Sequence, residues 1–343
     1  ARAMAAAIIA DDVLNDDAPK VLVCGPSRSG KTSILKVVFQ KLSPHETLFL
    51  ESTPKAEVTP INRNALVRFK FIDFPGATTF DQTSDGMLFE RTGVVVIVID
   101  AQEEKEPYND AILYAKRLIE VAYKANPKIS FDILIHKVDG DRFFDENQKT
   151  DIQGLMHGKL MEELQERVDV PIQFHCTSIY DHTIFEAISK VVQKLLPQLP
   201  DLEQCLDALI TNSRMDKAYL FDLLSKLYIA SDPQPVDLQS YELCADMIDV
   251  VIDVSCIYSV NEDGVASSFS SEGKASCVIH LKNGTLLYLR EVDRSLVLVC
   301  ILREENFDRQ HLLDYNIKVF KDALLEIFKV SQRPPNSFQS GGS

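Results

Sequence analysis

Short apolar runs alternate with segments of helical periodicity over the first 196 residues of the chain. The runs have the length of β-strands, and the continuously apolar run at 94–99 is typical of a strand covered on both faces. We expect strands at 21–24, 47–50, 66–74, 94–99, 131–135 and 172–176. We expect helices at 33–42, 109–125, 151–167 and 184–196. This alternation predicts an α/β domain with a mostly parallel sheet and helices on both faces.

The pattern changes after Pro197 and Pro200, which are expected to end a helix and stiffen a linker. Beyond them, the sequence predicts strands at 218–229, 275–281, 286–292 and 296–302. It predicts helices at 202–211, 236–258 and 311–328. The pair Asn283-Gly284, between two of these strands, is a strong hairpin signal. The second half is therefore expected to be an α+β domain, an antiparallel sheet with helices against it.

These patterns divide the chain into five parts. The expected parts are a flexible tail at 1–18, a first domain at 19–196, a linker at 197–201, a second domain at 202–330 and a flexible tail at 331–343. A chain of 343 residues is long enough for two domains of roughly 150 residues each.

The expected helix at 236–258 is apolar nearly all round. One face carries Tyr241, Cys244, Ile248, Val251 and Ser255. Another face carries Leu243, Met247, Val250, Val254 and Ile257. Two interpretations remain open: the sheet and the C-terminal helix cover both faces within the domain, or one face forms an interface with another subunit.

Composition narrows the function classes. A net charge of −15 argues against a protein that mainly grips nucleic-acid phosphates or adsorbs to an anionic membrane. No apolar run approaches the ~18–20 residues that span a bilayer, so we expect no direct membrane insertion. The seven cysteines form no C-x-x-C pair and the seven histidines form no zinc-like cluster, which favours reduced thiols in a cytoplasmic protein.

A phosphate-binding motif follows the first predicted strand. Residues Gly25 to Thr32 match G-x-x-x-x-G-K-S/T and open the predicted helix at 33–42. In this motif the backbone N–H groups cradle phosphates, the lysine (Lys31) reaches the β- and γ-phosphates and the Thr32 hydroxyl ligates Mg²⁺. The candidate phosphate-binding residues are Ser27, Arg28, Ser29, Gly30, Lys31, Thr32 and Ser33.

A second motif, D-x-x-G, ends the predicted strand at 66–74. In it, Asp73 is expected to reach Mg²⁺ through water, and the Gly76 N–H is expected to sense a γ-phosphate. Thr53, which follows Thr32 by 21 residues, is our candidate for the switch threonine that completes the Mg²⁺ coordination. An ordinary loop hydroxyl is the alternative. The candidate catalytic residues are Lys31, Thr53 and Gly76, and the candidate metal ligands are Thr32, Thr53 and Asp73.

Two further motifs favour guanine over adenine. His136-Lys137-Val138-Asp139 resembles N-K-x-D with His in place of Asn, and an imidazole can donate one hydrogen bond to the phosphate loop as Asn would. A carboxylate only accepts hydrogen bonds, so Asp139 suits the N1–H and N2–H₂ donors of guanine, and the Lys137 stem can cover the purine. Ser178 and Ile179 follow the last predicted strand, where a backbone N–H would contact the base carbonyl.

Each later motif also has an ordinary interpretation. Asp73 can be a turn former, Lys137 and Asp139 a solvated surface pair, and Ser178 a helix cap. All of them, however, lie at the carboxyl end of a predicted strand, the edge at which open α/β sheets bind ligands. The set therefore predicts a GTP or GDP site with Mg²⁺.

With these motifs, the sequence resembles the C/D-type subunits of the Rag family of GTPases, which has fungal Gtr members. The resemblance covers 20–330 and is carried by phrases at 36–39, 49–53, 135–140, 177–182, 190–194 and 236–258. It implies a P-loop G domain followed by a roadblock or longin-like dimerisation domain. It also implies GTPase-activating regulators and a heterodimer with an A/B-type Rag subunit through 202–330. It further implies recruitment to a lysosomal or vacuolar scaffold and a relay of amino-acid sufficiency to the TOR kinase complex.

One position departs from the resemblance. Residue 77 is Ala, where C/D-type subunits carry the Gln that orients the attacking water. Ser27 would also crowd that water, so we expect weak GTP hydrolysis. A guanine-nucleotide switch is the leading hypothesis, and a nucleotide-stabilised scaffold that hardly cycles is the alternative. Lys137 and Asp139 disfavour a third reading, an ATP-dependent kinase or transport ATPase.

Overall fold

A computed structural model describes residues 18–63, 67–76, 78–80, 82–103, 108–140, 143, 145–164, 171–258, 276–293 and 295–331. They belong to two compact units, and the boundary between these units falls after Leu195 in the sequence. Most of both expected tails, at 1–17 and 332–343, and Ala77 lie outside the described residues.

The first unit is built on a six-stranded sheet in the order β2-β3-β1-β4-β5-β6. Its strands are β1 (Lys20–Cys24), β2 (Glu57–Asn62), β3 (Arg68–Asp73), β4 (Thr92–Asp100), β5 (Ser130–His136) and β6 (Ile172–Thr177). Each neighbouring pair is parallel except β2 with β3. The prediction of a mostly parallel sheet is confirmed.

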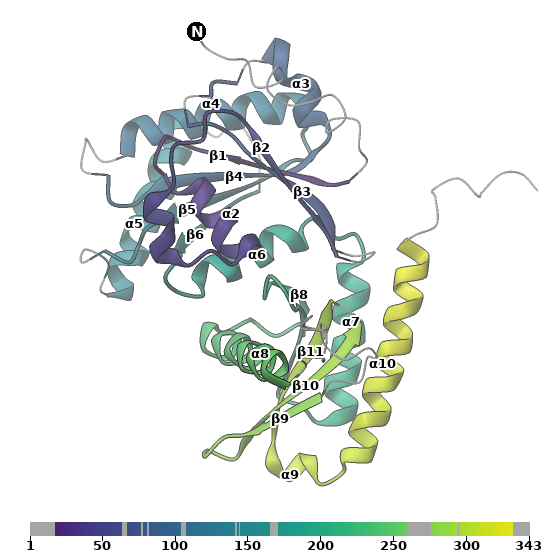
Figure 1. The fold of residues 1–343 in the computed structure, drawn as a ribbon. Coiled ribbons are helices and arrows are strands. Elements are labelled where there is room, and N and C mark those ends of the chain that lie inside the picture. Colours follow the sequence, from purple (N-terminus) through teal and green to yellow (C-terminus); the bar gives the residue numbers. More distant parts are fainter. Residues whose placement is uncertain are drawn as a thin grey trace, which may run out of the picture. The chain divides into compact units, whose positions relative to one another are not determined.

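Helices cover both faces of this sheet. They are α2 (Lys31–Gln40), α3 (Gln82–Glu90), α4 (Asn109–Ala125), α5 (Glu146–Leu164) and α6 (Thr183–Gln193). In Figure 1, α3 and α4 lie on one side of the strands, and α2 and α6 lie on the other. Leu22 and Cys24 belong to the core that includes α4 and α5, whereas the equally buried Val21 and Val23 alternate toward the opposite face. After Lys20 the strand is apolar throughout because both of its faces are buried.

The prediction of a strand at 47–50 is wrong. Residues Pro44–Phe49 form a 3₁₀ helix, η2. The Ser43 backbone N–H donates to the Glu46 carboxylate at 3.0 Å, and the Thr47 hydroxyl donates to the Pro44 carbonyl at 2.7 Å. These local hydrogen bonds favour a helical turn over an extended strand.

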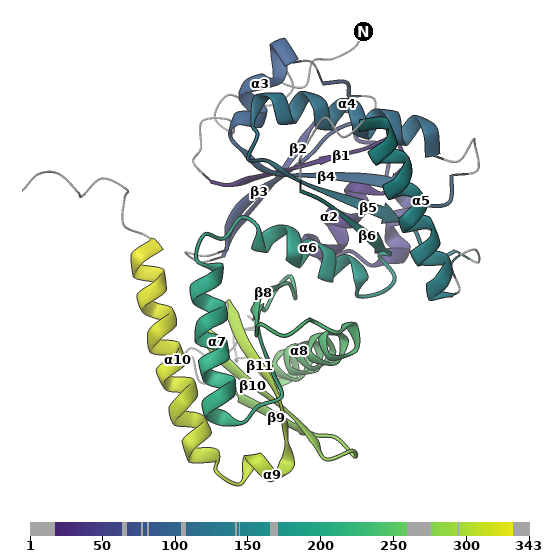
Figure 2. The same ribbon diagram turned by 180° about the vertical axis from the view of Figure 1, so that it is seen from behind.

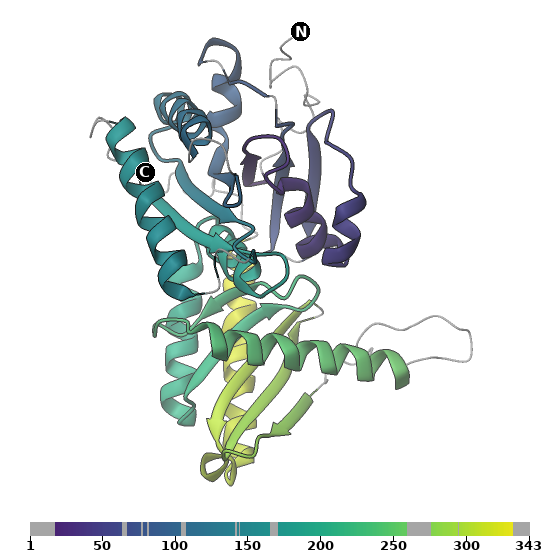
Figure 3. The same cartoon turned by 90° about the vertical axis from the view of Figure 1, so that its left-hand side faces the viewer.

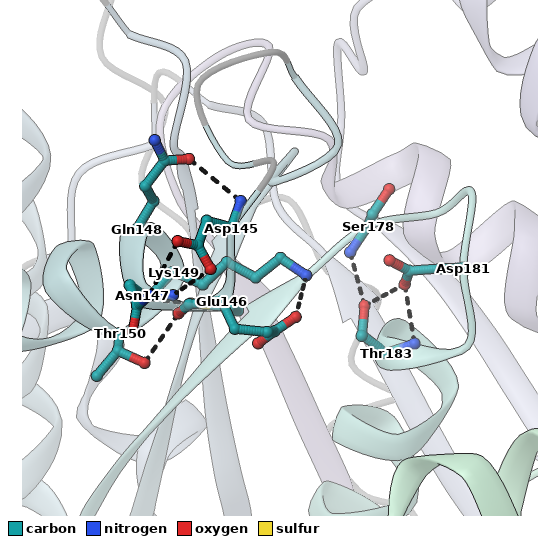
Figure 4. A network of polar contacts seen from close by, with 10 residues as sticks. Asp145, Glu146, Asn147, Gln148, Lys149, Thr150, Ser178, Asp181 and Thr183 are labelled. Atoms are coloured by element: carbon teal, nitrogen blue, oxygen red, sulfur yellow. Dashed lines mark hydrogen bonds and ion pairs between the residues drawn. The ribbon is translucent and has the colours of Figure 1, made fainter.

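Three other elements of this unit differ from expectation. Helix α3, at Gln82–Glu90, was not expected. Helix α5 begins at Glu146 instead of residue 151. Two hydrogen bonds cap this earlier start: the Asp145 N–H donates to Gln148 Oε1 at 3.3 Å, and the Asn147 N–H donates to an Asp145 carboxylate oxygen at 3.3 Å (Figure 4). Strand β2 was not expected. It lies at the sheet edge, where the missing N–H of Pro60 is tolerated.

The second unit is built on a five-stranded antiparallel sheet in the order β8-β7-β11-β10-β9. Its strands are β7 (Lys217–Asp222), β8 (Tyr228–Ser231), β9 (Ser276–His280), β10 (Thr285–Asp293) and β11 (Leu296–Arg303). Its helices are α7 (Leu199–Ser213), α8 (Leu238–Tyr258), α9 (Glu304–Phe307) and α10 (Gln310–Ser331). Figures 2 and 3 show α8 on one face of the sheet, with α7 and α10 beside each other on the opposite face. The expected antiparallel sheet with helices is confirmed.

Two boundaries in this unit differ from expectation. The segment expected as one strand at 218–229 forms two paired strands, β7 and β8. A turn separates them, because the Asp222 carboxylate accepts from the Ser225 N–H at 2.9 Å and from the Ser225 hydroxyl at 2.6 Å. Helix α7 begins at Leu199, so 199–201, expected as linker, are helical. Pro200 lies in the first turn, where a missing N–H costs nothing.

Helix α8 is buried on one face and exposed on another. Its buried side chains are Tyr241, Cys244, Ala245, Met247, Ile248 and Val251. Val250 and Val254 are 52% and 48% exposed. The interpretation in which the C-terminal helix covers α8 is wrong, because α10 packs against α7 on the other face of the sheet.

Candidate functional site

The loop between β1 and α2 is wound by left-handed backbone. Arg28 and Gly30 have φ values of 65° and 103°, and Gly25 has 147°. A Cβ on Gly25 would lie 2.3 Å from the Val98 carbonyl oxygen, so only glycine fits there. The first N–H groups of α2, which begins at Lys31, have no partners within the helix. Loop and helix end together form a concave set of donors suited to phosphate.

Lys31 spans the centre of this loop. Its ammonium donates to the carbonyl oxygens of Gly25 at 2.9 Å and Pro26 at 2.8 Å. Burial lowers the pKa of Lys31, and the nearby Asp73 opposes that shift. The lysine is therefore a buried cation, held by its own loop at the mouth of the donor set.

Three oxygen-bearing side chains from distant segments meet beside Lys31. The Thr32 hydroxyl lies 2.5 Å from Asp73 Oδ2 and 2.6 Å from the Thr53 hydroxyl. The other oxygen of Asp73 is buried and has no hydrogen-bond partner among the described residues. Burial raises the pKa of Asp73, and the Thr32 hydrogen bond partly offsets this. The structure thus brings together all three predicted metal ligands, with the oxygen chemistry that Mg²⁺ prefers.

Gly76 lies directly against the phosphate loop. A Cβ on Gly76 would lie 2.3 Å from the Ser27 nitrogen and 2.5 Å from the Ser27 hydroxyl. The D-x-x-G segment therefore reaches the position in the loop where a terminal phosphate is expected. Two other candidate phosphate-binding residues lie nearby in the chain. Ser29 is buried in the loop, and Ser33 is half-buried in the first turn of α2.

His136 joins the phosphate loop to the base-reading segment. Its Nδ1 lies 3.0 Å from the Thr177 hydroxyl. On the other side, a Cβ on Gly30 would lie 2.6 Å from the imidazole Cδ2, so Gly30 and His136 are in contact. Burial, followed by the neighbouring Lys137, lowers the pKa of His136 to about 4. The imidazole is neutral near pH 7 and packs where Asn stands in the N-K-x-D pattern.

Lys137 is half-buried and has two hydrogen-bond partners. Its ammonium donates to the Arg28 carbonyl at 2.8 Å and to Asp100 Oδ2 at 2.5 Å, and its backbone is left-handed with φ of 67°. The predicted base-reading lysine is therefore tied to the phosphate loop. Asp100 was not predicted. Its only sequence signal is that it is the acidic residue ending the buried strand β4.

The loop after β6 holds the base-reading carboxylate. The Ser178 hydroxyl donates to Asp139 Oδ1 at 2.8 Å. The Ser178 N–H donates to the Thr183 hydroxyl at 2.9 Å, and Asp181 accepts from both the N–H and the hydroxyl of Thr183 (Figure 4). Ser178 thus orients Asp139, while its own N–H is engaged by Thr183. Ile179 is half-buried in the turn that follows.

The predicted residues other than Thr53, which comes after η2, converge because they follow neighbouring strands. β1, β3, β4, β5 and β6 are parallel, so the segments after them open at one edge of the sheet. Among the described residues there is no cluster of three or more His, Cys, Asp or Glu. The Thr32–Asp73–Thr53 set offers two hydroxyls and one carboxylate, whereas zinc sites are built mainly from Cys and His. In the same part of the chain, no helix combines the length and apolarity needed to cross a membrane.

Comparison with known proteins agrees with this geometry. The family description "Gtr1/RagA G protein conserved region" matches residues 20–248. The chain is 50% identical to "Ras-related GTP-binding protein C" of Mus musculus, over 91% of this chain and 77% of that protein. It is 44% identical to "GTP-binding protein gtr2" of Schizosaccharomyces pombe, over 90% of this chain and 98% of that protein. With the phosphate loop, the D-x-x-G segment and the base-reading loops converging at one sheet edge, the chain belongs to the Rag/Gtr family of GTP-binding proteins, on its C/D and Gtr2 side.

Proposed function

We propose that this chain is the C/D-type subunit of a Rag heterodimer and switches between GTP- and GDP-bound forms. The observation that carries the proposal is the hydroxyl–carboxylate set of Thr32, Thr53 and Asp73. It links the phosphate loop, the segment after η2 and the end of β3. A ligand at this set would therefore change the order of the loops at 44–64 and 76–92.

The bound ligands are proposed to be guanine nucleotide and Mg²⁺. Mg²⁺ would be held by Thr32, by Thr53 and, through water, by Asp73, and would neutralise charge on the phosphates. The unpartnered oxygen of Asp73 supports this assignment, because a buried carboxylate oxygen without a donor is costly. Lys31 would bind the β- and γ-phosphates, and the Gly76 N–H would report the γ-phosphate. Asp139 would read the guanine edge, with Lys137 over the ring and the loop at Ser178 and Ile179 beside it.

Base exchange tests the site. Asp139→Asn replaces an acceptor with a donor and should move preference from GTP to xanthosine triphosphate. Both nucleotides are titrated against the wild-type chain and the variant, with Glu103→Gln as a control that removes an exposed charge outside the site. A wild type that binds neither nucleotide, together with an unchanged variant, would overturn the assignment.

Hydrolysis is proposed to be weak. Ala77 has no side chain to orient water, and Ser27 lies against Gly76 where that water would enter. Single-turnover GTP hydrolysis should rise in Ala77→Gln and stay unchanged in Ala77→Met, which adds bulk without a polar group. Equal rates in all three proteins would favour the alternative, a nucleotide-stabilised scaffold. The scaffold also predicts that partner affinity is the same with GTP and GDP.

The second unit is proposed to hold the A/B-type partner. The exposed Val250 and Val254 on α8 support this, because a pair of apolar side chains beside a buried face is typical of a subunit interface. We propose that recruitment to a lysosomal or vacuolar scaffold, GTPase-activating regulators and control of the TOR kinase complex follow from this assembly. Co-purification with an A/B-type subunit should be lost in Val250→Asp/Val254→Asp and kept in Asp246→Asn, an exposed polar position of α8.

A further inference from the structure

Three polar contacts from the end of β4 hold the base-reading segment, and no sequence motif announces them. The Ala101 N–H donates to the His136 carbonyl at 2.8 Å. The Gln102 side-chain amide donates to the Lys137 carbonyl at 2.9 Å. The Lys137 ammonium donates to Asp100 Oδ2 at 2.5 Å. The start of the base-reading segment is thus bound to β4 through both backbone and side chain.

Asp100 itself is fixed in place. Its second oxygen, Oδ1, accepts from the Gln102 backbone N–H at 2.9 Å, so both oxygens have defined partners. Gln102 in turn lies tightly against the next turn, because a Cβ on Gly140 would be 2.7 Å from the Gln102 amide nitrogen. Asp100 and Gln102 therefore contact Lys137 through its side chain and through its backbone carbonyl.

Such support matters because the Lys137 backbone is left-handed, with φ of 67°. A non-glycine residue in that conformation is strained and persists where its surroundings enforce it. The Lys137 ammonium is also drawn toward the Arg28 carbonyl of the phosphate loop at 2.8 Å. Asp100 and Arg28 together fix the ammonium, and the carbon stem is then stretched between the base-reading segment and the phosphate loop.

We propose that Asp100 and Gln102 are positioning residues of the guanine site, which hold the Lys137 stem where it covers the purine ring. The inference rests on the proposed function. Because the ring is common to GTP, GDP and xanthosine nucleotides, the support acts on all of them equally. It sets how tightly a nucleotide is held, and Asp139 sets which base is accepted.

A purely structural role for the Asp100–Lys137 pair would make loss of Asp100 lower the unfolding temperature of the nucleotide-free chain. The Asp100 and Lys137 side chains are 24% and 34% exposed, and ion pairs that contact water contribute little to stability. Loss of Asp100 should therefore leave the unfolding temperature of the nucleotide-free chain nearly unchanged. A hydrogen bond to a charged group that orders a ligand contact is instead expected to change affinity roughly tenfold.

The test is a double-mutant cycle on the full chain, read by dissociation of a fluorescent GDP analogue. Asp100→Ala and Lys137→Ala should each speed dissociation roughly tenfold, and the double variant should be no faster than Lys137→Ala alone. Dissociation from Asp100→Asn should be slower than from Asp100→Ala, and Gln102→Ala should speed dissociation by less than tenfold. Glu103→Ala is the matched control and should dissociate at the wild-type rate. In an Asp139→Asn background, Asp100→Ala should weaken the binding of xanthosine diphosphate by the same factor as it weakens the binding of GDP in the wild-type background.

Two results would overturn the inference. Additive effects of Asp100→Ala and Lys137→Ala would show that Asp100 acts elsewhere, and a wild-type dissociation rate in Asp100→Ala would show that it does not act. Either result leaves the proposed function intact as long as the wild-type chain binds GDP. A wild type that binds no guanine nucleotide would overturn the proposed function and this inference together.

Discussion

Lys194 donates to both carboxylate oxygens of Asp132, at 2.8 and 2.6 Å. Asp132 lies inside β5 and is fully buried, and His175 Nε2 lies 3.0 Å from the same carboxylate. A charge at the centre of a sheet is tolerated only when its partners replace water. The ammonium at the end of α6 is therefore part of the core of the first unit.

Removing that ammonium should be costly. Lys194→Met leaves a buried carboxylate without its main partner, so the free energy of unfolding should fall by about 3 kcal/mol in a urea titration. Lys190→Met, which breaks a more exposed pair with Glu186 on the same helix, should cost no more than about 0.5 kcal/mol. Asp132→Asn should restore part of the loss in Lys194→Met. Equal stability of the two single variants would contradict the assignment.

The buried His136 should make stability depend on pH. Burial lowers its pKa from 6.5 to about 4, so between these values the unfolded chain binds a proton that the folded chain does not. The contribution of neutral His136 to the free energy of unfolding is therefore constant above pH 6.5. It is lost as the pH falls toward 4, at up to about 1.4 kcal/mol per pH unit. His136→Asn should show a flatter decline over this window when unfolding is followed from pH 7.5 to 4. Superimposable profiles would refute the prediction.

Gly30→Ala should damage nucleotide binding through the His136 contact. The new methyl group would need a φ of 103° and would lie 2.6 Å from the imidazole ring. We expect GDP affinity to fall at least roughly tenfold, measured by calorimetry. Gly154→Ala is the matched control. Gly154 lies in α5, and a Cβ added there would meet no atom within 4 Å, so alanine should raise stability by about 0.5–1 kcal/mol and leave GDP binding unchanged.

Thr53→Ala should uncouple Mg²⁺ from the triphosphate. The variant loses the oxygen that lies 2.6 Å from Thr32, so GTP affinity at saturating Mg²⁺ should fall roughly tenfold, with a smaller change for GDP. Ser52→Ala removes an exposed neighbouring hydroxyl and should behave as wild type. Titration of both nucleotides with and without a chelator distinguishes the cases. An equal loss for GTP and GDP would show that Thr53 does not respond to the terminal phosphate.

The sequence predicts which candidate residues share one edge of the sheet because its motifs are local. Each begins where a buried strand ends, and strand ends of a parallel sheet meet at one edge, so the placement of Lys31, Asp73 and Asp139 there could be predicted without coordinates. Asp100 was missed because its partner, Lys137, is 37 positions away, and no periodicity reports such a pair. The buried Asp132 did leave a signal, since it interrupts an apolar run, but its partner Lys194 is 62 positions away.

Errors in the elements have equally local causes. The apolar run around Thr47 suits a strand by composition, yet the bond from the Ser43 N–H to Glu46 closes a turn first. Strand β2 carries polar residues and Pro60, which hide an edge strand from a search for apolar runs. Such segments depend on hydrogen bonds that hydrophobic patterning does not encode.

The Thr32 hydroxyl carries one proton and can therefore donate only one hydrogen bond. Asp73 as a carboxylate can only accept, so Thr32 spends its proton on Asp73, and Thr53 must supply the proton shared with Thr32. The three groups therefore form a directional chain that runs from Thr53 through Thr32 to Asp73. A hydroxyl oxygen keeps lone pairs beside its own proton, so Thr32 could ligate a cation and still donate to Asp73. A cation would compete with the Thr53 proton for the lone pairs of Thr32, and the segment bearing Thr53 would then be held by coordination instead of a shared proton.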